Sequence, residues 1–470
     1  MSSGRRRRGM ACTGGLDASV RLPWMSVIAQ RLREARAEAG LSLEAMGALV
    51  GVPADAIRSF EEEARWPPTS TVRAYATVFG SRVERFLRDG AVNAPSALLF
   101  RSAFEQGGDL SQALGPSDLR VLGRFLSCVA DAHELEVAMG RGRPKLELDD
   151  PSRGEELPWV RGRACAEYVR RELGLGDAPI PSMLALLRER LGWSVFFVTP
   201  DELSSTVEGA STAAPGPGLL INLVGGRESW WRTRASLAHE MCHVLFDTRA
   251  RPYLLSPEGS LKDRGDWSLV ERFAELESRA NAFAAYFLVP RQSLRALVGA
   301  NAVTGTIVDE VCRVFGVGRT MAVHRLGHEF GLSEQDKAEL LETWSRSPDV
   351  RPHPDAALSP GLPGEFLSRR VVEAVEVGVL DTVQARSILR VPMSEEIAAL
   401  GARGAALLEP ESLARARAEA HGWTLGMGSC RSVSAMKTPA GWTVTIEGRR
   451  GSSVVQRDVE VSAGFELVSA

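Results

Sequence analysis

The chain has 470 residues, which is too long for one hydrophobic core, so we expect several domains. Hydrophobic residues make up 44% of the sequence and charged residues 24%, as in ordinary globular proteins. A net charge of -3 excludes a general electrostatic attraction to nucleic acid or membranes, so any contact with DNA must be local.

Cysteine usage and hydropathy indicate the compartment. The six cysteines include no CxxC pair, which favours free thiols in a reducing cytosol over a disulfide framework. No run approaches the roughly 18 apolar residues of a membrane span, and no apolar stretch follows the basic cluster Arg5 to Arg8. We therefore expect a cytoplasmic protein that does not bind membranes, and interpret residues 1–24 as a flexible extension.

Residues 25–92 contain short amphipathic helices separated by turns, a pattern typical of a helix-turn-helix domain. The segment "VIAQRLREARAEAG" carries its apolar residues on one helical stripe, and Ser42 is a suitable N-cap for the next helix. A third helix is expected to begin at Pro53, after the turn at Gly51-Val52.

This segment resembles the Xre/lambda-repressor-like family of DNA-binding domains. The resemblance implies a recognition helix that begins near Ala54 and presents four residues outward: Ala54, Asp55, Arg58 and Ser59. Only Arg58 among them is a strong phosphate or guanine contact. Three glutamates add negative charge near the end of this helix (Glu61, Glu62 and Glu63), and five arginines partly compensate it (Arg31, Arg33, Arg36, Arg65 and Arg73). DNA binding and a protein-docking or structural role both remain open.

The middle of the chain changes character twice. Residues 93–155 are predicted to form a helical linker domain around a long amphipathic helix over 118–140. Residues 156–348 mix helices with two predicted strands, "WSVFFV" at 193–198 and "GLLINLV" at 218–224, and are therefore expected to form an α+β domain.

The C-terminal part is predicted to hold two smaller units. Residues 349–365 are rich in Pro, Asp and Ser and are interpreted as a linker, so 349–407 is expected to be a linker with a small helical unit. A second helical turn unit at 379–400 is acidic, which favours packing or partner docking over DNA reading. Residues 408–470 include apolar–polar alternation on both sides of Gly448 to Gly451, which predicts a β-hairpin.

The segment "SLAHEMCHVLFD" contains two histidines and a glutamate in HExxH spacing. His239 and His243 are four residues apart and share a helix face, so both imidazoles can reach one metal ion while Glu240 lies beside them. A catalytic zinc ion usually takes a third protein ligand. The alternative is a helix whose two histidines are satisfied within the core.

The next helix, predicted over 271–290, offers that third ligand. Glu277 lies near the edge of its apolar stripe and is aimed inward, whereas Glu275 points away. Asn281 is four residues further along the same face, where it can hydrogen-bond to a ligand histidine. An ordinary surface glutamate remains the alternative for Glu277.

The pair "ASLAHEMCHVLFD" and "ESRANAFAAYFLVP" resembles the ImmA/IrrE family of zinc metallopeptidases, over roughly residues 160 to 332. The resemblance implies that His239, His243 and Glu277 bind zinc and that Glu240 is the general base. Relatives act on repressors, so it also implies a protein substrate, such as a helix-turn-helix repressor. An Xre-type domain ahead of the peptidase is a layout of the family's regulator-like members.

We therefore expect a multidomain, mainly α protein: an N-terminal helix-turn-helix, a central zincin-like α+β peptidase domain, and a C-terminal helical unit plus β-hairpin. The favoured function is a zinc endopeptidase that cleaves a transcriptional regulator and is delivered to DNA or to its substrate by the helix-turn-helix, in transcription regulation or a stress response. One alternative is a DNA-binding regulator whose peptidase domain is a sensor. Another is a toxin–antitoxin or defence component that acts through protein contacts. A homodimer is compatible with each.

Three finer expectations concern the peptidase site. His324, His328 and Tyr253 are candidates for stabilising the oxyanion, and each could equally be structural. Cys242 is expected to be an inert packed thiol rather than an oxidation-sensitive one. A substrate chain is expected to add as a strand to the edge of "GLLINLV".

Overall fold

The structure is a computed structural model in which helices predominate and two small sheets lie in separate parts of the chain. It describes isolated positions between 411 and 425 and the following ranges: 23–38, 42–79, 83–87, 99–100, 116–142, 146–152, 157–205, 207–213, 216–224, 230–247, 267–342, 355, 360–391, 427–450 and 453–462. Tyr253 lies outside the described residues.

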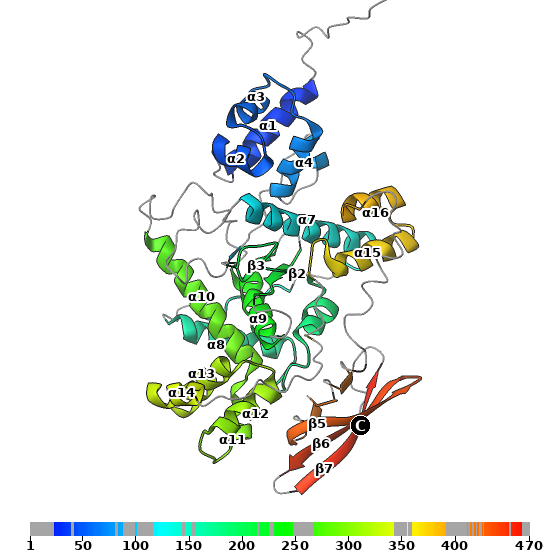
Figure 1. The fold of residues 1–470 in the computed structure, drawn as a ribbon. Coiled ribbons are helices and arrows are strands. Elements are labelled where there is room, and N and C mark those ends of the chain that lie inside the picture. The colour runs from blue at the N-terminus through cyan, green and yellow to red at the C-terminus, as the bar shows by residue number, and fades with distance from the viewer. Residues whose placement is uncertain are drawn as a thin grey trace, which may run out of the picture.

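The N-terminal helices form a compact bundle, at the top of Figure 1. They are α1 (Pro23–Glu38), α2 (Leu43–Val50), α3 (Ala54–Glu61), α4 (Thr69–Val78) and α5 (Val83–Leu87). The predicted apolar stripe of α1 is buried, with Ile28 and Leu32 at 2% and 0% exposure against Ile57 of α3. The α2–turn–α3 pair is therefore fixed by packing of its apolar faces, as the sequence predicts.

The long predicted helix is α7 (Pro116–Ala138), and it lies between the bundle and the central sheet (Figure 1). Two helices from the C-terminal part pack with it, α15 (Gly364–Glu376) and α16 (Thr382–Leu389). Phe125 of α7 meets Phe196 of the sheet edge-on at 6.0 Å, and Phe196 meets Phe366 of α15 at 6.1 Å. The helix α7 therefore shares one core with its neighbours, whereas the sequence predicts a separate helical linker domain over 93–155.

The central sheet has the strand order β1-β3-β4-β2. Its strands are β1 (Leu99–Phe100), β2 (Ser194–Val198), β3 (Gly209–Thr212) and β4 (Gly218–Asn222); β2 and β4 are parallel and the other pairs antiparallel. The predicted strands at 193–198 and 218–224 are confirmed. The expectation that a substrate adds to the 218–224 edge is wrong, because β4 lies between two strands and its backbone hydrogen-bonding groups are already used.

Helices cover this sheet and complete the central unit. They are α8 (Pro158–Glu172), the π-helix η1 (Ala185–Arg190), α9 (Trp230–Phe246), α10 (Trp267–Leu288), α11 (Arg291–Val298), α12 (Gly305–Phe315), α13 (Arg319–Phe330) and α14 (Glu334–Glu342). Gly162 allows α8 to cross α10 closely, because a Cβ atom there would lie 2.3 Å from the carbonyl oxygen of Arg279. None of the helices in the described ranges has the length and apolar character that a membrane span requires.

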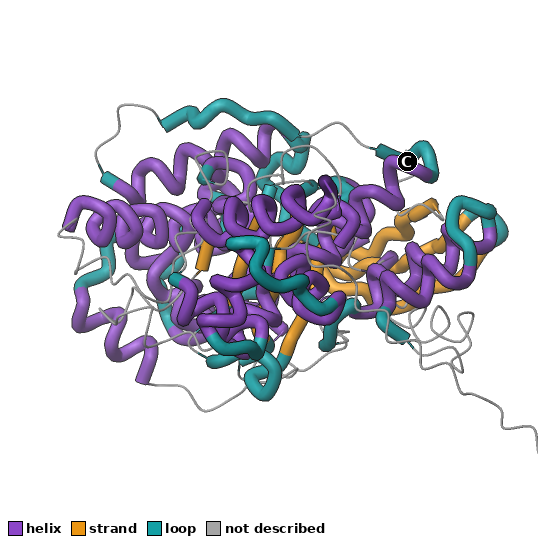
Figure 2. The backbone as a smooth tube through the Cα atoms, turned by 90° about the horizontal axis from the view of Figure 1, so that it is seen from above, coloured by secondary structure: helices purple, strands orange, loops and turns teal. Residues whose placement is uncertain are grey.

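The C-terminal sheet is a meander of β5 (Gly428–Thr438), β6 (Gly441–Arg450) and β7 (Ser453–Ser462). The predicted hairpin is β6–β7, paired from Gly441↔Ser462 to Arg450↔Ser453. The third strand of this sheet, β5, was not predicted. These strands lie apart from the central sheet in Figure 1, and Figure 2 shows from above how helices surround much of the strand structure.

Asp355 shows that the predicted linker at 349–365 includes an anchored position. Its side chain is 0% exposed and forms an ion pair of 2.6 Å with Arg234 of α9. The same carboxylate accepts hydrogen bonds from Ser182 Oγ at 2.5 Å and from the backbone N–H of Met183 at 2.9 Å. The Pro- and Asp-rich composition of residues 349–365 predicts a linker. In the structure, the Asp355 carboxylate neutralises the buried guanidinium of Arg234.

Replacing Asp355 by Asn should lower the free energy of unfolding by about 3–5 kcal/mol, because the buried Arg234 loses its counter-charge. Urea unfolding followed by fluorescence measures this change. The matched control is Asp309→Asn: Asp309 is 67% exposed in its pair with Arg319, so a change below about 1 kcal/mol is expected. Equal unfolding midpoints for the parent and Asp355→Asn would show that the anchor contributes nothing.

Candidate metal centre

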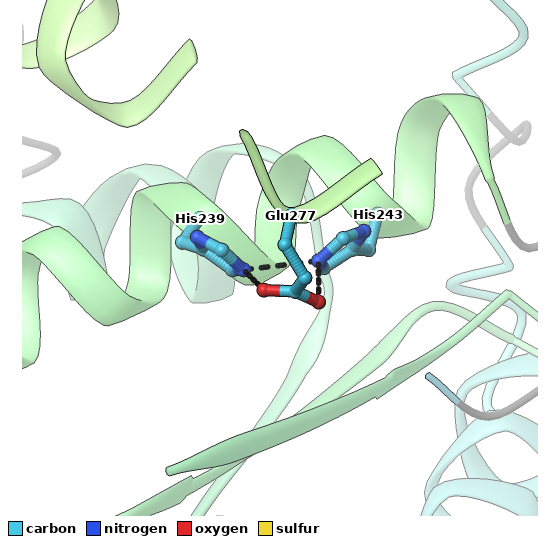
Figure 3. Close-up of side chains that lie close together, drawn as sticks. All are labelled: His239, His243 and Glu277. Atoms are coloured by element: carbon cyan, nitrogen blue, oxygen red, sulfur yellow. Dashed lines mark hydrogen bonds and ion pairs between the residues drawn. The ribbon is translucent and has the colours of Figure 1, made fainter. Parts of the chain in front are cut away.

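Three buried side chains from two helices converge on one point (Figure 3). The Nε2 atoms of His239 and His243, both on α9, are 3.0 Å apart. Glu277 of α10 places Oε2 3.1 Å from Nε2 of His239 and Oε1 3.4 Å from Nε2 of His243. The ligand atoms of all three lie within 4.8 Å of one another, which is the spacing that a shared ion needs.

The helical periodicity explains why these three residues meet. His239 and His243 are one turn apart on α9, and both are at most 1% exposed. Glu277 is 3% exposed, whereas Glu275, two residues earlier on α10, is exposed. The structure thus brings together the three residues that the sequence predicts and leaves Glu275 outside, as expected from its position on the helix.

Each histidine is held through its other ring nitrogen. Nδ1 of His239 lies 3.0 Å from Oδ1 of Asn281, and Nδ1 of His243 lies 2.7 Å from Oδ2 of Asp247. Because a carbonyl or carboxylate oxygen can only accept, each Nδ1 donates its hydrogen and each Nε2 keeps its lone pair toward Glu277. This is the tautomer in which a histidine coordinates metal through Nε2.

Asp247 was not predicted as a site residue, although its spacing from His243 could have indicated it. It follows His243 by four residues, the same spacing that relates the two histidines. Its second oxygen pairs with the buried Arg279 of α10, and Arg279 also reaches Asp150 at 3.4 Å. Nothing in the local sequence marks Arg279 or Asp150, because their partners are distant along the chain.

The charge of the centre is set by these contacts. Burial raises the pKa of Glu277, but when His239 and His243 carry protons on Nε2 their hydrogen bonds and charge outweigh it and hold that pKa well below its usual range. A metal ion would take the place of those protons. Burial raises the pKa of the neighbouring Cys242 thiol to about 12, so this thiol stays protonated at neutral pH. A fully buried, protonated Cys242 agrees with the packed, unreactive thiol that we expected.

Glu240 is 0% exposed and lies against the first residue of β3. A Cβ atom on Gly209 would be 2.5 Å from Oε1 of Glu240, so only glycine leaves room for this carboxylate. The strand β3 was not predicted, because its residues, "GAST", show no alternation of apolar and polar side chains. The contact between Gly209 and Glu240 could therefore not be anticipated.

The histidine candidates for an oxyanion donor are less well placed. His324 and His328 are both exposed on α13, and neither belongs to the cluster of His239, His243 and Glu277. The ring of His328 packs beside Trp159 at 5.7 Å, and the partial burial of the ring together with nearby cations lowers its pKa. Both histidines therefore lie on the surface of α13.

The helix α3 presents part of the predicted DNA-contact set. Asp55 and Arg58 are exposed, whereas Ala54 and Ser59 are half-buried. The Ser59 hydroxyl donates to the backbone oxygen of Asp55 at 2.8 Å. Arg58 is thus the exposed cation among the four.

One part of the predicted charge balance on this domain needs correction. Glu61 is 5% exposed and accepts two hydrogen bonds from Arg36, at 2.8 and 2.7 Å. The pair lies inside the bundle beside Tyr75, whose pKa is raised by burial and by Glu61. Arg36 and Glu61 therefore neutralise each other and contribute little to the surface potential around Arg58.

Two family models match the chain. Residues 27–85 match the helix-turn-helix domain model HTH_31, and residues 223–327 match Peptidase_M78, the IrrE N-terminal-like domain. No curated protein matches the sequence. Both matches confirm the resemblances drawn from the sequence, and the second includes all three residues of the cluster. This multidomain, mainly α chain therefore carries an N-terminal helix-turn-helix domain and a central IrrE N-terminal-like domain.

Proposed function

We propose that the chain is a zinc-dependent endopeptidase with its centre at His239, His243 and Glu277. The observation that carries the proposal is the convergence of two Nε2 atoms and a carboxylate, with each Nδ1 bound to a fixed acceptor. Two imidazoles and one carboxylate are a donor set that suits zinc, which is borderline in softness. A structural histidine pair has no need of a third buried ligand group.

Glu240 is the proposed general base. Zinc held by the three ligands would polarise the scissile carbonyl and lower the pKa of water toward neutrality. Glu240 takes the proton of the attacking water and passes it to the leaving amine. Glu240 adjoins His239 on α9, and its carboxylate lies against Gly209 of β3; this position supports the role.

The substrate that we infer is a regulatory protein, such as a helix-turn-helix repressor, with the N-terminal domain delivering the enzyme to DNA or to that partner. The exposed Arg58 on α3 and the family match at residues 27–85 support a local DNA contact. A second candidate is a DNA-binding regulator that uses the peptidase domain as a sensor. The shared core of the N-terminal bundle, α7 and β2 favours it, because packed elements can transmit a change between domains.

The purified protein should contain about one zinc ion per chain, and His239→Ala should lose it. Elemental analysis measures this. Glu277→Gln should also lower zinc content, whereas Glu275→Gln is the matched control on the same helix and should not. Full zinc in the His239→Ala protein would contradict the assignment of the ligands.

Glu240→Gln should retain zinc but lose hydrolysis, because the ligands remain and the base is removed. Given a rate contribution of about 10²–10⁴-fold from general-base catalysis, the loss should be of that order. The assay follows cleavage of an unfolded protein such as casein, with zinc content as the control. Unchanged cleavage by the Glu240→Gln protein would rule out the proposed role.

Asn281→Ala should weaken zinc retention by about 10–100-fold, because His239 loses the acceptor that fixes its tautomer. Competition with a chelator measures the affinity. Asn281 is exposed, so thermal unfolding of the metal-free protein should be unchanged. Asp247→Asn should weaken zinc similarly but also destabilise the metal-free protein, because Arg279 loses its buried partner. Equal chelator sensitivity of Asn281→Ala and the parent would leave Asn281 without a role in positioning.

Full-length protein should bind promoter DNA at low salt, and Arg58→Ala should weaken that binding and reduce its salt dependence. Arg431→Ala is the matched control, because Arg431 is exposed on the C-terminal sheet, far along the chain from α3. A gel-shift series at increasing salt gives both quantities. No shift at low salt would favour protein docking as the role of this domain.

A further inference from the structure

Ser211 of β3 carries a buried hydroxyl group that the proposed mechanism does not use. The side chain is 0% exposed, and its Oγ atom has no hydrogen-bond partner among the residues that the structure describes. A hydroxyl that is removed from water without a partner destabilises the folded protein. Such a group in a native core therefore indicates a functional role or an ordered water molecule.

The alternation of side chains along β3 places Ser211 on the face of the sheet that α9 covers. Its cross-strand partner Leu219 belongs to the apolar core that includes α9, whereas the neighbouring Ala210 belongs to the core that includes α7. Residues two apart in a strand point to the same side, so Ser211 shares its face with Gly209. Gly209 is the position that lies against the Glu240 carboxylate.

The strand β3 differs from its neighbours in the size of the side chains that face α9. On β4 and β2 these side chains are large and apolar: Leu219, Ile221, Val195 and Phe197. On β3 the equivalent positions are Gly209 and Ser211, which are small, and Ser211 is also polar. An ordered water molecule in a protein core needs both properties, since it requires room and two or more polar partners.

The geometry of the strand relates Ser211 to Glu240. A Cβ atom at Gly209 would lie 2.5 Å from Oε1 of Glu240. Side chains two residues apart on one strand face are separated by about 6.5–7 Å. Two hydrogen bonds through one water molecule span about 5–6 Å. A water molecule bound to the Ser211 hydroxyl can therefore reach the Glu240 carboxylate.

We propose that Ser211 is a positioning residue for the general base: its hydroxyl holds a water molecule that hydrogen-bonds to the Glu240 carboxylate. The inference rests on the peptidase function proposed above. The hydroxyl can donate to this water or accept from it, and the water donates a hydrogen to the carboxylate. The bond limits rotation of the carboxylate and keeps it oriented for proton transfer, while Ser211 itself touches neither substrate nor metal.

Ser211→Ala removes the hydroxyl and is tested in the full-length, zinc-loaded protein with casein as substrate. The kcat value should fall about 3–10-fold, as expected for the loss of one hydrogen bond, while KM and zinc content stay at the parent values. Ser211→Thr keeps a hydroxyl and should restore kcat. Ser194→Ala is the matched control and should leave kcat unchanged, because Ser194 is a buried serine of β2 that alternates with the α9-facing Val195.

A double-mutant cycle in the metal-free full-length protein tests the link between the two side chains without zinc or hydrolysis. The variants are Ser211→Ala, Glu240→Ala and their combination, and urea unfolding gives the midpoint of each. Because the water connects the two side chains, the combined variant should shift the midpoint by less than the sum of the single shifts. Ser194→Ala with Glu240→Ala is the control pair, and its shifts should be additive.

A kcat of Ser211→Ala equal to that of the parent would overturn the proposal, and so would additive midpoint shifts for Ser211→Ala and Glu240→Ala. Loss of zinc from Ser211→Ala would overturn it as well, because the hydroxyl would then act on the metal ligands. Absence of casein cleavage by the parent would contradict the peptidase proposal, and the midpoint cycle would still decide whether Ser211 and Glu240 are linked.

Discussion

The structure depends on one constraint: α9 is buried along most of its length although it carries charged and polar side chains. Arg234, His239, Glu240 and His243 are each at most 1% exposed. Leaving such groups without partners inside a protein would cost several kcal/mol each. The partners identified here come from α10, from the end of α9 and from Asp355, so the burial of α9 constrains where these groups lie.

The same requirement links the metal centre to distant parts of the chain. Arg234 binds Asp355, which is 121 residues away, and Asp247 binds Arg279, which lies between Glu277 and Asn281 on α10. Each ion pair therefore fixes the register of an element that carries or supports a residue of the proposed metal site. A site with ligands held by packed helices and paired charges is ordered in advance, which is what a catalytic metal centre requires.

Helical spacing made part of this site predictable. The residues whose partners are far away in the sequence could not be predicted. His239, His243, Glu277 and Asn281 follow from residues four apart on a helix and from one apolar stripe. Asp355 could not be found in this way, because its neighbours have the composition of a linker and its partner is far away in sequence. The strand β3 was missed since small residues buried on both faces give no alternating pattern.

The wrong prediction of a β4 sheet edge has a topological origin. A strand read from sequence has no known neighbours, so β4 could be taken for an edge although β3 and β2 enclose it. The strand order shows that β1 and β2 are the edge strands of this sheet, and that the backbone N–H of Gly361 donates to Phe197 of the edge strand β2.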